Sequence, residues 1–251
     1  MLKRLIPLIL ALLALPALAL ADGLQDMSDG ERDAFRAEVR AYLLDNPEVL
    51  MEAIAVLEQR KQEQQANNDS ALLVALSDEI FNDGYSYVGG NPDGDITLVE
   101  FLDYRCGYCR KAHDEVHELI ESDGNIRLVI KEFPILGEQS VLSARLAVAT
   151  LHKSGPEAYR RLGDFLMTFN GSITAQNVGA ILENLEIEAA PVVAYMDDPA
   201  VSGQIGAVHV LAEKLAITGT PTFAIGAELL RGYLPLENMR EVVAYYRNQQ
   251  Q

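Results

Sequence analysis

The hydrophobic pattern after residue 28 predicts a series of amphipathic helices. Ser28 and Glu31 have the spacing of a capping box, which begins a helix, and Asn46-Pro47 marks the start of a second helix. Apolar residues three or four positions apart place one apolar stripe on each helix. They are Phe35, Val39, Tyr42 and Leu43 in the first helix and Leu50, Ile54 and Leu57 in the second. Each stripe needs a partner, which is either the rest of the chain or a second copy of the same helices.

A polar stretch follows these two helices. Residues 58–70, EQRKQEQQANNDS, would be polar on every side of a helix, which is typical of a solvated or bridging segment. The run at 67–70 predicts a break, and a third helix is expected over about 70–82. We therefore expect a helical stalk at 22–69 and a separate domain at 70–251.

From residue 91 onward, short apolar runs alternate with helical segments. The runs at 96–104 and 126–133 are apolar enough for strands buried on both faces, and 222–226 with 228–232 predict a hairpin. Helical patterns occupy 106–122, 139–153, 156–169, 174–185, 189–214 and 235–247, with a break expected at Pro191. This order predicts an α/β fold in which helices are grouped into an insertion at about 138–210.

Residues 1–21 have the pattern of a cleavable secretory signal. Lys3 and Arg4 precede a nearly continuous apolar run at 5–20, and Ala19-Leu20-Ala21 offers small residues for cleavage. The alternative is a membrane anchor, for which the run is short and is interrupted by two prolines. We therefore expect an exported protein. Its net charge of −17 argues against nucleic acid and against anionic membrane surfaces as partners.

Both cysteines of the chain lie in the segment FLDYRCGYCRKAHDEV, at Cys106 and Cys109. A zinc site usually needs four ligands, and the chain has no second CxxC. A disulfide between the pair would close so small a ring that it would stabilise the fold by only about 2 kcal/mol. The spacing therefore favours a redox-active dithiol. Cys106 begins a predicted helix, where backbone N–H groups stabilise a thiolate, so we expect it to attack a disulfide and Cys109 to resolve the mixed disulfide.

Three motifs in order carry a resemblance to a known family. They are an acidic residue six positions before CxxC, KEFPILGEQSVLSARLAVA at 131–149 and ITGTPTFAIG at 217–226. Together they resemble the DsbA-like branch of the thioredoxin superfamily. With the predicted stalk, the whole mature chain resembles the suppressor-of-copper-sensitivity protein C (ScsC) group of exported thiol–disulfide oxidoreductases. The resemblance implies a thioredoxin fold with an inserted α-helical domain, a periplasmic location and a homotrimer formed through the N-terminal helices.

The resemblance also implies roles for residues of the site. Cys106 corresponds to the nucleophile, Cys109 to the resolving thiol and Pro221 to a cis-proline that faces the disulfide. Thr220 and the Gly107-Tyr108 pair would contact the bound polypeptide.

The same resemblance makes Glu100 a buried acid beneath the dithiol. In that role it would move the proton of the resolving thiol through water, and burial should raise its pKa. The alternative is that Glu100 is buried only because it pairs with Lys131.

Three classes of function remain open on this basis. Gly-Tyr between the cysteines and Thr before the cis-proline occur in several disulfide isomerases of the family. We therefore expect an isomerase for misfolded exported proteins, with a membrane thiol–disulfide reductant or oxidant as its redox partner. A disulfide oxidase is the alternative within the same chemistry.

The second class is a copper-binding or copper-tolerance protein that uses the same thiols. Cu(I) would be held by Cys106, Cys109 and His113, since thiolates favour this ion. Otherwise His113 and His117 are ordinary residues of a helix surface, and no cofactor is expected beyond the redox-active disulfide. The third class is a chaperone that uses the helical insertion as an apolar groove.

Overall fold

The computed structural model describes residues 27–249, so the expected signal segment at 1–21 lies outside the described residues. The chain divides into two compact units, Met1–Arg60 and Lys61–Gln251. The boundary thus falls at 60/61 rather than at the expected 69/70. Within residues 27–249, no helix is both long enough and apolar enough to span a bilayer.

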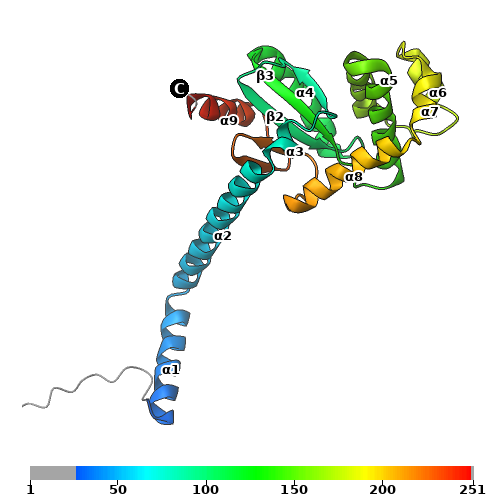
Figure 1. The fold of residues 1–251 in the computed structure, drawn as a ribbon. Coiled ribbons are helices and arrows are strands. Elements are labelled where there is room, and N and C mark those ends of the chain that lie inside the picture. The colour runs from blue at the N-terminus through cyan, green and yellow to red at the C-terminus, as the bar shows by residue number, and fades with distance from the viewer. Residues whose placement is uncertain (1–26, 250–251) are drawn as a thin grey trace, which may run out of the picture. The chain divides into compact units, whose positions relative to one another are not determined.

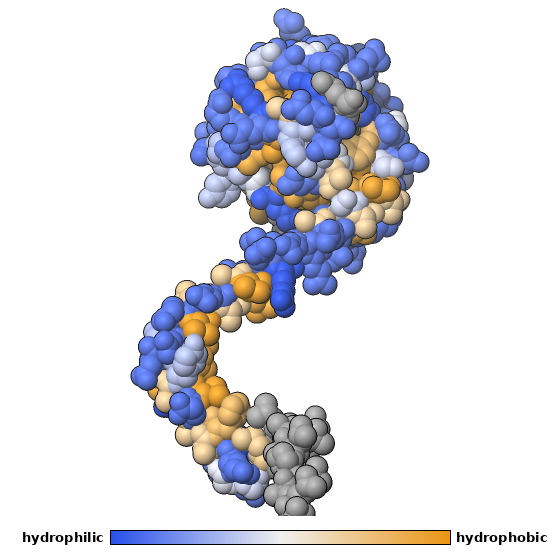
Figure 2. All heavy atoms as spheres, turned by 90° about the vertical axis from the view of Figure 1, so that its left-hand side faces the viewer, coloured by the Kyte–Doolittle hydropathy of each residue, from blue (hydrophilic) through white to orange (hydrophobic). Residues whose placement is uncertain are grey.

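The first unit is built from helix α1 (Asp29–Asp45) and the beginning of helix α2 (Glu48–Ala75). Ser28 begins α1 with the expected capping box: its side chain accepts the Glu31 N–H, and the Glu31 carboxylate accepts the Ser28 N–H at 2.9 Å. No residue of α1 is buried. Figure 2 shows apolar side chains gathered along these helices. The predicted stripes are therefore present, and their residues are exposed except for the half-buried Leu43.

Helix α2 continues through residues 67–70, where the sequence predicts a break. Asp69 explains why this polar run stays helical. Its buried carboxylate accepts hydrogen bonds from the Arg231 guanidinium at 2.6 and 2.9 Å and from the Gln65 side chain at 3.0 Å. One turn later the side chain of Leu73 is also buried. Tertiary contacts of α2 thus override the weak local helix propensity.

The second unit contains a five-stranded sheet with the order β1-β3-β2-β4-β5. The strands are β1 (Tyr87–Gly90), β2 (Ile96–Leu102), β3 (Ile126–Glu132), β4 (Thr222–Ile225) and β5 (Glu228–Arg231). Strands β2 and β3 are parallel and are joined by helix α4 (Gly107–Asp123), whereas the other pairs are antiparallel. The sequence does not predict β1, because its two glycines are poor strand formers. The expected hairpin is β4–β5.

Helices cover both faces of the sheet (Figure 1). Because side chains alternate along a strand, Leu98 and Leu102 belong to one apolar core and Val99 and Phe101 to the other. The first core includes residues of α4 and of the last helix, α9 (Leu236–Gln249). The second includes residues from the end of α2, from α3 (Ser77–Phe81) and from α8 (Pro199–Lys214).

The helical insertion lies between β3 and β4. It consists of α5 (Glu138–Thr168), α6 (Val178–Asn184), α7 (Ala189–Tyr195) and α8. The expected interruption inside α5 is a kink at Gly155, whose φ of +80° favours glycine. Pro191 lies in the first turn of α7 and does not break it. Helix α7 is instead separated from α8 at Asp198-Pro199. There the Asp198 side chain accepts the Ala200 N–H at 2.8 Å and caps α8.

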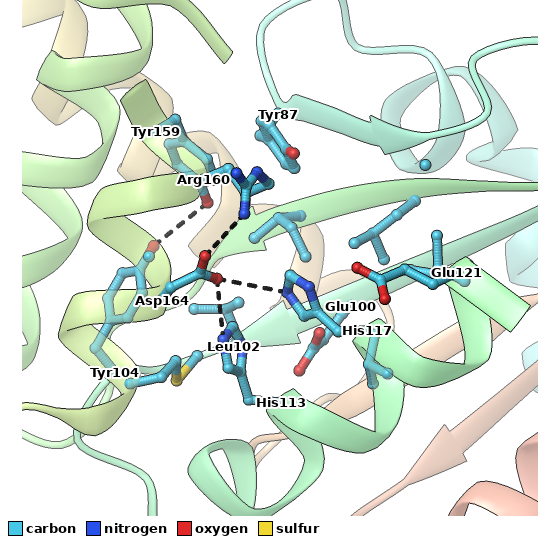
Figure 3. Close-up of a pocket in the computed structure, with 17 residues that line it drawn as sticks. Tyr87, Glu100, Leu102, Tyr104, His113, His117, Glu121, Tyr159, Arg160 and Asp164 are labelled. Atoms are coloured by element: carbon cyan, nitrogen blue, oxygen red, sulfur yellow. Dashed lines mark hydrogen bonds and ion pairs between the residues drawn. The ribbon is translucent and has the colours of Figure 1, made fainter. Parts of the chain in front are cut away.

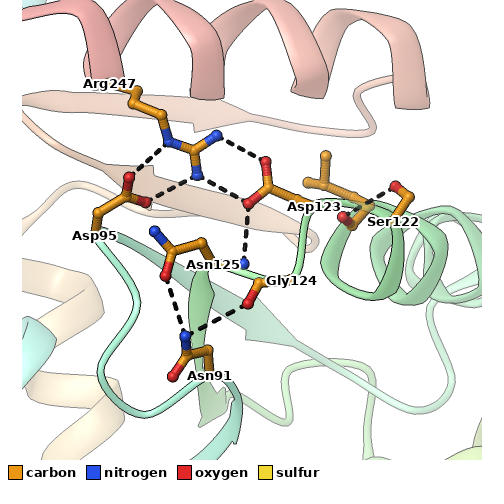
Figure 4. A network of polar contacts seen from close by, with 8 residues as sticks. Asn91, Asp95, Ser122, Asp123, Gly124, Asn125 and Arg247 are labelled. Carbon is orange, nitrogen blue, oxygen red and sulfur yellow. Dashed lines mark hydrogen bonds and ion pairs between the residues drawn. The ribbon is translucent and has the colours of Figure 1, made fainter.

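A polar network fixes α9 beside the C-terminal end of α4 (Figure 4). The Arg247 guanidinium donates to both oxygens of Asp95 and both oxygens of Asp123, each at 2.8 Å. Asp123 also accepts the Asn125 N–H at 3.1 Å. The network lies at the opposite end of α4 from the cysteines, so it holds α4 at the end remote from the dithiol.

Candidate active site

The two cysteines lie at the junction between β2 and α4. Cys106 is the N-cap residue of α4, and Cys109 is in its first turn. Both are free thiols; the residue exposure is 7% for Cys106 and 0% for Cys109. Tyr108, between them, is 63% exposed. The nucleophile expected from the sequence therefore occupies a helix N-terminus, and the side chain beside it faces solvent.

Asp103, which the sequence analysis missed, holds this junction in place. Its buried carboxylate accepts the Arg105 N–H at 2.8 Å and the Ile135 and Leu136 N–H groups at 2.8 and 3.0 Å. Its carbonyl accepts the Cys106 N–H at 3.0 Å. The buried charge is thus satisfied by the backbone of the dithiol turn and of the segment after β3. A polar residue directly after an apolar strand was the available signal.

The loop before β4 brings Thr220 and Pro221 to the dithiol. The Thr220–Pro221 peptide bond is cis, as the resemblance implied. Cys106 Sγ lies 3.1 Å from the Thr220 carbonyl oxygen. Two segments more than 110 positions apart therefore meet at the nucleophile, because β4 pairs directly with β2.

Two arginines join the start of α4 to the helical insertion. Arg110 donates to the Leu166 and Phe169 carbonyls at 3.3 and 2.7 Å and to the Asn170 side chain at 2.9 Å. Arg105 donates to the Gly171 carbonyl at 2.9 Å. The two guanidinium groups therefore bind the last turn of α5 and the segment that follows it.

Glu100 is buried in β2 on the face that carries α4. Its residue exposure is 4%, and burial raises the pKa of its carboxyl to about 8, as expected. Burial, and then the charge of Glu100, also raise the pKa of the Cys109 thiol well above its usual range. Glu100 and Cys109 thus both favour their protonated forms.

The alternative explanation of the burial of Glu100, a pairing with Lys131, is wrong. Glu100 is in register with Ile130, so its neighbour Lys131 points to the opposite face of the sheet. There the Lys131 ammonium donates to the Asp83 carboxylate at 2.5 Å and to the Glu79 carbonyl at 2.9 Å. Lys131 therefore binds residues on the face of the sheet opposite to α4 and does not touch Glu100.

A cavity of about 180 Å³ lies between β2, α4 and α5 (Figure 3). Glu100, His113, His117 and Asp164 are among its lining residues. The cavity gives the buried carboxyl of Glu100 a route toward the protein surface, because His117 and Asp164 are only half-buried.

Glu132, at the end of β3, is a second buried acid that the sequence analysis missed. One of its oxygens accepts hydrogen bonds from the Tyr104 hydroxyl at 2.8 Å and the Tyr159 hydroxyl at 2.5 Å. Burial raises the pKa of Glu132 to about 8. Its position in the KEF motif was the only signal, and that motif alone does not distinguish a buried from an exposed acid.

The copper ligand set considered as an alternative, Cys106, Cys109 and His113, is not among the groups of close metal-ligating side chains in residues 27–249. Among the described residues, the group of metal-ligating side chains with ligand atoms within 4.8 Å is His113, His117 and Asp164. His113 points from α4 toward Asp164 of α5, at 3.1 Å, and leaves the two thiols without an imidazole partner.

A CxxC pair at a helix N-terminus, beside a cis-proline loop on a sheet of this order, defines a thioredoxin-fold thiol–disulfide site. Residues 82–244 match the family model described as thioredoxin, and residues 31–64 match the model described as the copper resistance protein ScsC N-terminal domain. The chain belongs to the thioredoxin family, and its residues 31–64 resemble the ScsC N-terminal domain.

Three solved structures illustrate the similarity. A thioredoxin-like oxidoreductase from Silicibacter pomeroyi DSS-3 is 37% identical, with a TM-score of 0.63 over 68% of this chain and 97% of that one. The thiol–disulfide exchange protein alpha-DsbA2 from Wolbachia pipientis is 26% identical, with a TM-score of 0.68 over 73% and 98%. Proteus mirabilis ScsC in a transitional conformation is 25% identical, with a TM-score of 0.63 over 88% and 96%.

The chain also matches part of some much longer proteins. It spans about a quarter of the length of the curated sodium/proton antiporters it matches; for one from Salinispora arenicola, 24% of the antiporter is covered at 24% identity.

Proposed function

We propose that the protein is a periplasmic disulfide isomerase that acts on misfolded exported proteins. The observation that carries this proposal is the pairing of a thioredoxin-type dithiol with an N-terminal helix whose apolar side chains are unburied. Several dithiols held around one client suit the repeated attack that disulfide shuffling requires. The periplasmic location is supported by a relative, described as a periplasmic thioredoxin-like protein from Salmonella enterica serovar Typhimurium, that is 27% identical.

The chemistry begins at Cys106. Its thiolate attacks one sulfur of a substrate disulfide, the substrate S–S bond breaks, and the released substrate thiolate takes up a proton. The product is a mixed disulfide between Cys106 and the substrate. We propose that the Thr220 backbone, 3.1 Å from Cys106 Sγ, and the exposed Gly107-Tyr108 pair contact the bound polypeptide.

Two outcomes follow from the mixed disulfide. In isomerisation, another substrate thiolate attacks the substrate sulfur and releases Cys106, with no net redox change. In the alternative outcome, Cys109 loses its proton and attacks Cys106 Sγ, so the Cys106–Cys109 disulfide forms and the substrate leaves reduced. The proton of Cys109 would pass to the carboxylate form of Glu100 and then through the cavity. A membrane thiol–disulfide reductant would restore the dithiol.

Self-association is proposed to use the stripe on α1 and α2. Its members Phe35, Val39, Tyr42, Leu50, Ile54 and Leu57 are between 40% and 55% exposed. Leaving so many large apolar side chains in water is unfavourable, and a coiled coil between copies would bury them. We propose a homotrimer.

Charged substitutions in this stripe are expected to separate the oligomer and to remove isomerase activity. Leu50→Glu combined with Ile54→Glu should give a monomer by light scattering, because a buried charge opposes association. Refolding of a scrambled multi-disulfide substrate should fall at least about tenfold, whereas reduction of a small disulfide should persist. The matched control is Ala55→Glu, which adds one charge to another side of α2.

Two results would contradict the isomerase proposal. One is unchanged refolding of the scrambled substrate by a variant shown to be monomeric. The other is wild-type protein that oxidises a reduced peptide but does not act on the scrambled substrate, which is the behaviour of a disulfide oxidase.

A second candidate function is Cu(I) binding by the dithiol alone. It is favoured by the match of residues 31–64 to a domain described as belonging to a copper resistance protein. Anaerobic competition titration with a Cu(I) chelator should show one ion bound per chain, and Cys106→Ser should weaken it by about 100-fold or more, because the ion loses one of its two soft ligands. Equal affinity in this variant would remove the dithiol as the site.

A further inference from the structure

Three side chains with metal-binding atoms converge at the rim of the cavity beneath the dithiol. His113 and His117 lie one turn apart on the same face of α4, and Asp164 approaches from α5 (Figure 3). Asp164 Oδ1 lies 3.1 Å from His113 Nε2 and 3.7 Å from His117 Nε2. The ligand atoms of all three residues lie within 4.8 Å of one another. Two imidazoles and a carboxylate therefore point at one place.

These separations suit a tetrahedral divalent ion. Bonds of about 2.0–2.1 Å to nitrogen and oxygen at tetrahedral angles place neighbouring ligand atoms about 3.3 Å apart. The two distances from Asp164 Oδ1 lie within a few tenths of an ångström of this value. Imidazole suits zinc and copper, and a carboxylate oxygen completes three-residue zinc sites that keep a fourth position open.

The surroundings of Asp164 orient it for this role. The Arg160 guanidinium donates to Asp164 Oδ2 at 3.0 Å, which leaves Oδ1 directed at the two imidazoles. Such hydrogen bonds from an outer residue commonly fix a metal-binding carboxylate. Arg160 is itself a cation, but Glu121 also lines the cavity and adds a carboxyl group to it.

An ion could reach this place from solvent. The side-chain exposure is 17% for His113, 34% for His117 and 38% for Asp164, so the group is neither sealed nor spread over open surface. The adjoining cavity of about 180 Å³ has room for a water molecule as the fourth ligand.

We propose that His113, His117 and Asp164 form a binding site for a divalent late first-row metal ion, of which Zn²⁺ is the representative. The site is separate from the dithiol, because its three ligands come from α4 and α5 and include neither thiol. The alternative is that Asp164 serves only as a hydrogen-bond and ion-pair partner of the two imidazoles. The two roles differ in whether Zn²⁺ binds with these ligands.

The two thiols are removed for the test, so that they cannot compete with the proposed site for Zn²⁺. Full-length, untagged protein with Cys106→Ser and Cys109→Ser is titrated with Zn²⁺ by calorimetry. We expect one ion per chain with micromolar or tighter affinity. Adding His113→Gln and His117→Gln should weaken binding by about 100-fold or more, since two of three protein ligands are lost. His152→Gln is the matched control: this imidazole bonds to Gln204 and lies outside the group.

Two further measurements test the proposed metal site independently of the double histidine variant. Asp164→Asn, added to the thiol-free protein, tests the site if the double histidine variant does not fold, and it should weaken Zn²⁺ binding by about tenfold or more. Co²⁺ in the thiol-free protein should give the intense visible bands of a tetrahedral site, and these should vanish with the histidines. Absence of micromolar binding, or equal affinity in the histidine, Asp164→Asn and His152→Gln variants, would overturn the proposal.

Discussion

Replacing Cys106 with serine is expected to abolish thiol–disulfide exchange, with a fall in rate of about 1000-fold or more. Cys106 is the N-cap residue of α4 and the thiol that contacts the Thr220 loop, whereas Cys109 is fully buried and its pKa is raised well above the usual range. Cys109 therefore cannot replace Cys106 as the attacking thiolate. Turnover of a self-quenched fluorescent disulfide peptide measures the loss.

The matched variant Cys109→Ser should behave differently. It retains the nucleophile but lacks the resolving thiol, so mixed disulfides with a client should accumulate and be visible on non-reducing gels and by mass spectrometry. If Cys106→Ser retained exchange activity, or if Cys109→Ser formed no mixed disulfide, the assignment of the two thiols would be wrong.

Replacing Glu100 with glutamine is expected to change how stability depends on pH. Burial raises the pKa of Glu100 from 4.5 to about 8 in the folded chain. The folded state therefore holds this proton more tightly than the unfolded state does. The stability that results is fully present below pH 4.5 and is lost as pH rises through about 8. Wild-type protein should thus lose stability with rising pH in this window, by an amount on the order of a few kcal/mol from Glu100 alone.

Glutamine keeps the shape of the side chain but has no carboxyl to ionise. The difference in free energy of unfolding between Glu100→Gln and wild type should therefore shift in favour of the variant as pH rises. Glu132, whose pKa is also about 8, is present in both proteins. The charge of Glu100 contributes to that raised pKa, so removing it eases the ionisation of Glu132 and shifts the difference in the same direction. Urea unfolding from about pH 5 to about pH 9 gives the measurement.

Glu241→Gln, which removes an exposed carboxyl of α9, is the control for the loss of one acidic side chain. A difference between Glu100→Gln and wild type that did not change across this range would show that Glu100 keeps an ordinary pKa in the folded chain.

The main elements of the sheet were predictable because their signals are local. Strands β2 and β3 are apolar runs buried on both faces, and the residues of the dithiol and of the Thr220–Pro221 loop lie in recognisable motifs. The break expected at 67–70 was wrong because the partner of Asp69 is Arg231, which is remote in the sequence. No local pattern reveals that ion pair.

The partners of the polar side chains in the site could not be predicted from the sequence either. Glu100 and Lys131 both interrupt apolar strands and suggest a pair, but the register of β2 against β3 places them on opposite faces. One oxygen of Asp103 accepts the distant Ile135 and Leu136 N–H groups, and one oxygen of Glu132 accepts the Tyr104 and Tyr159 hydroxyls, partners that only the folded chain brings near. Likewise, the i, i+4 spacing of His113 and His117 is visible in the sequence, whereas Asp164 joins them only because α5 packs beside α4.

The hydrogen bonds of Arg110 have a mechanical consequence for catalysis. This residue follows Cys109 directly, and its side chain donates hydrogen bonds to two carbonyls at the C-terminal end of α5. A client that displaced the insertion would therefore pull on the same helical turn that carries the resolving thiol. Since Arg105 also bonds to the Gly171 carbonyl, two guanidinium groups would transmit a displacement of the insertion to the turn that carries the dithiol.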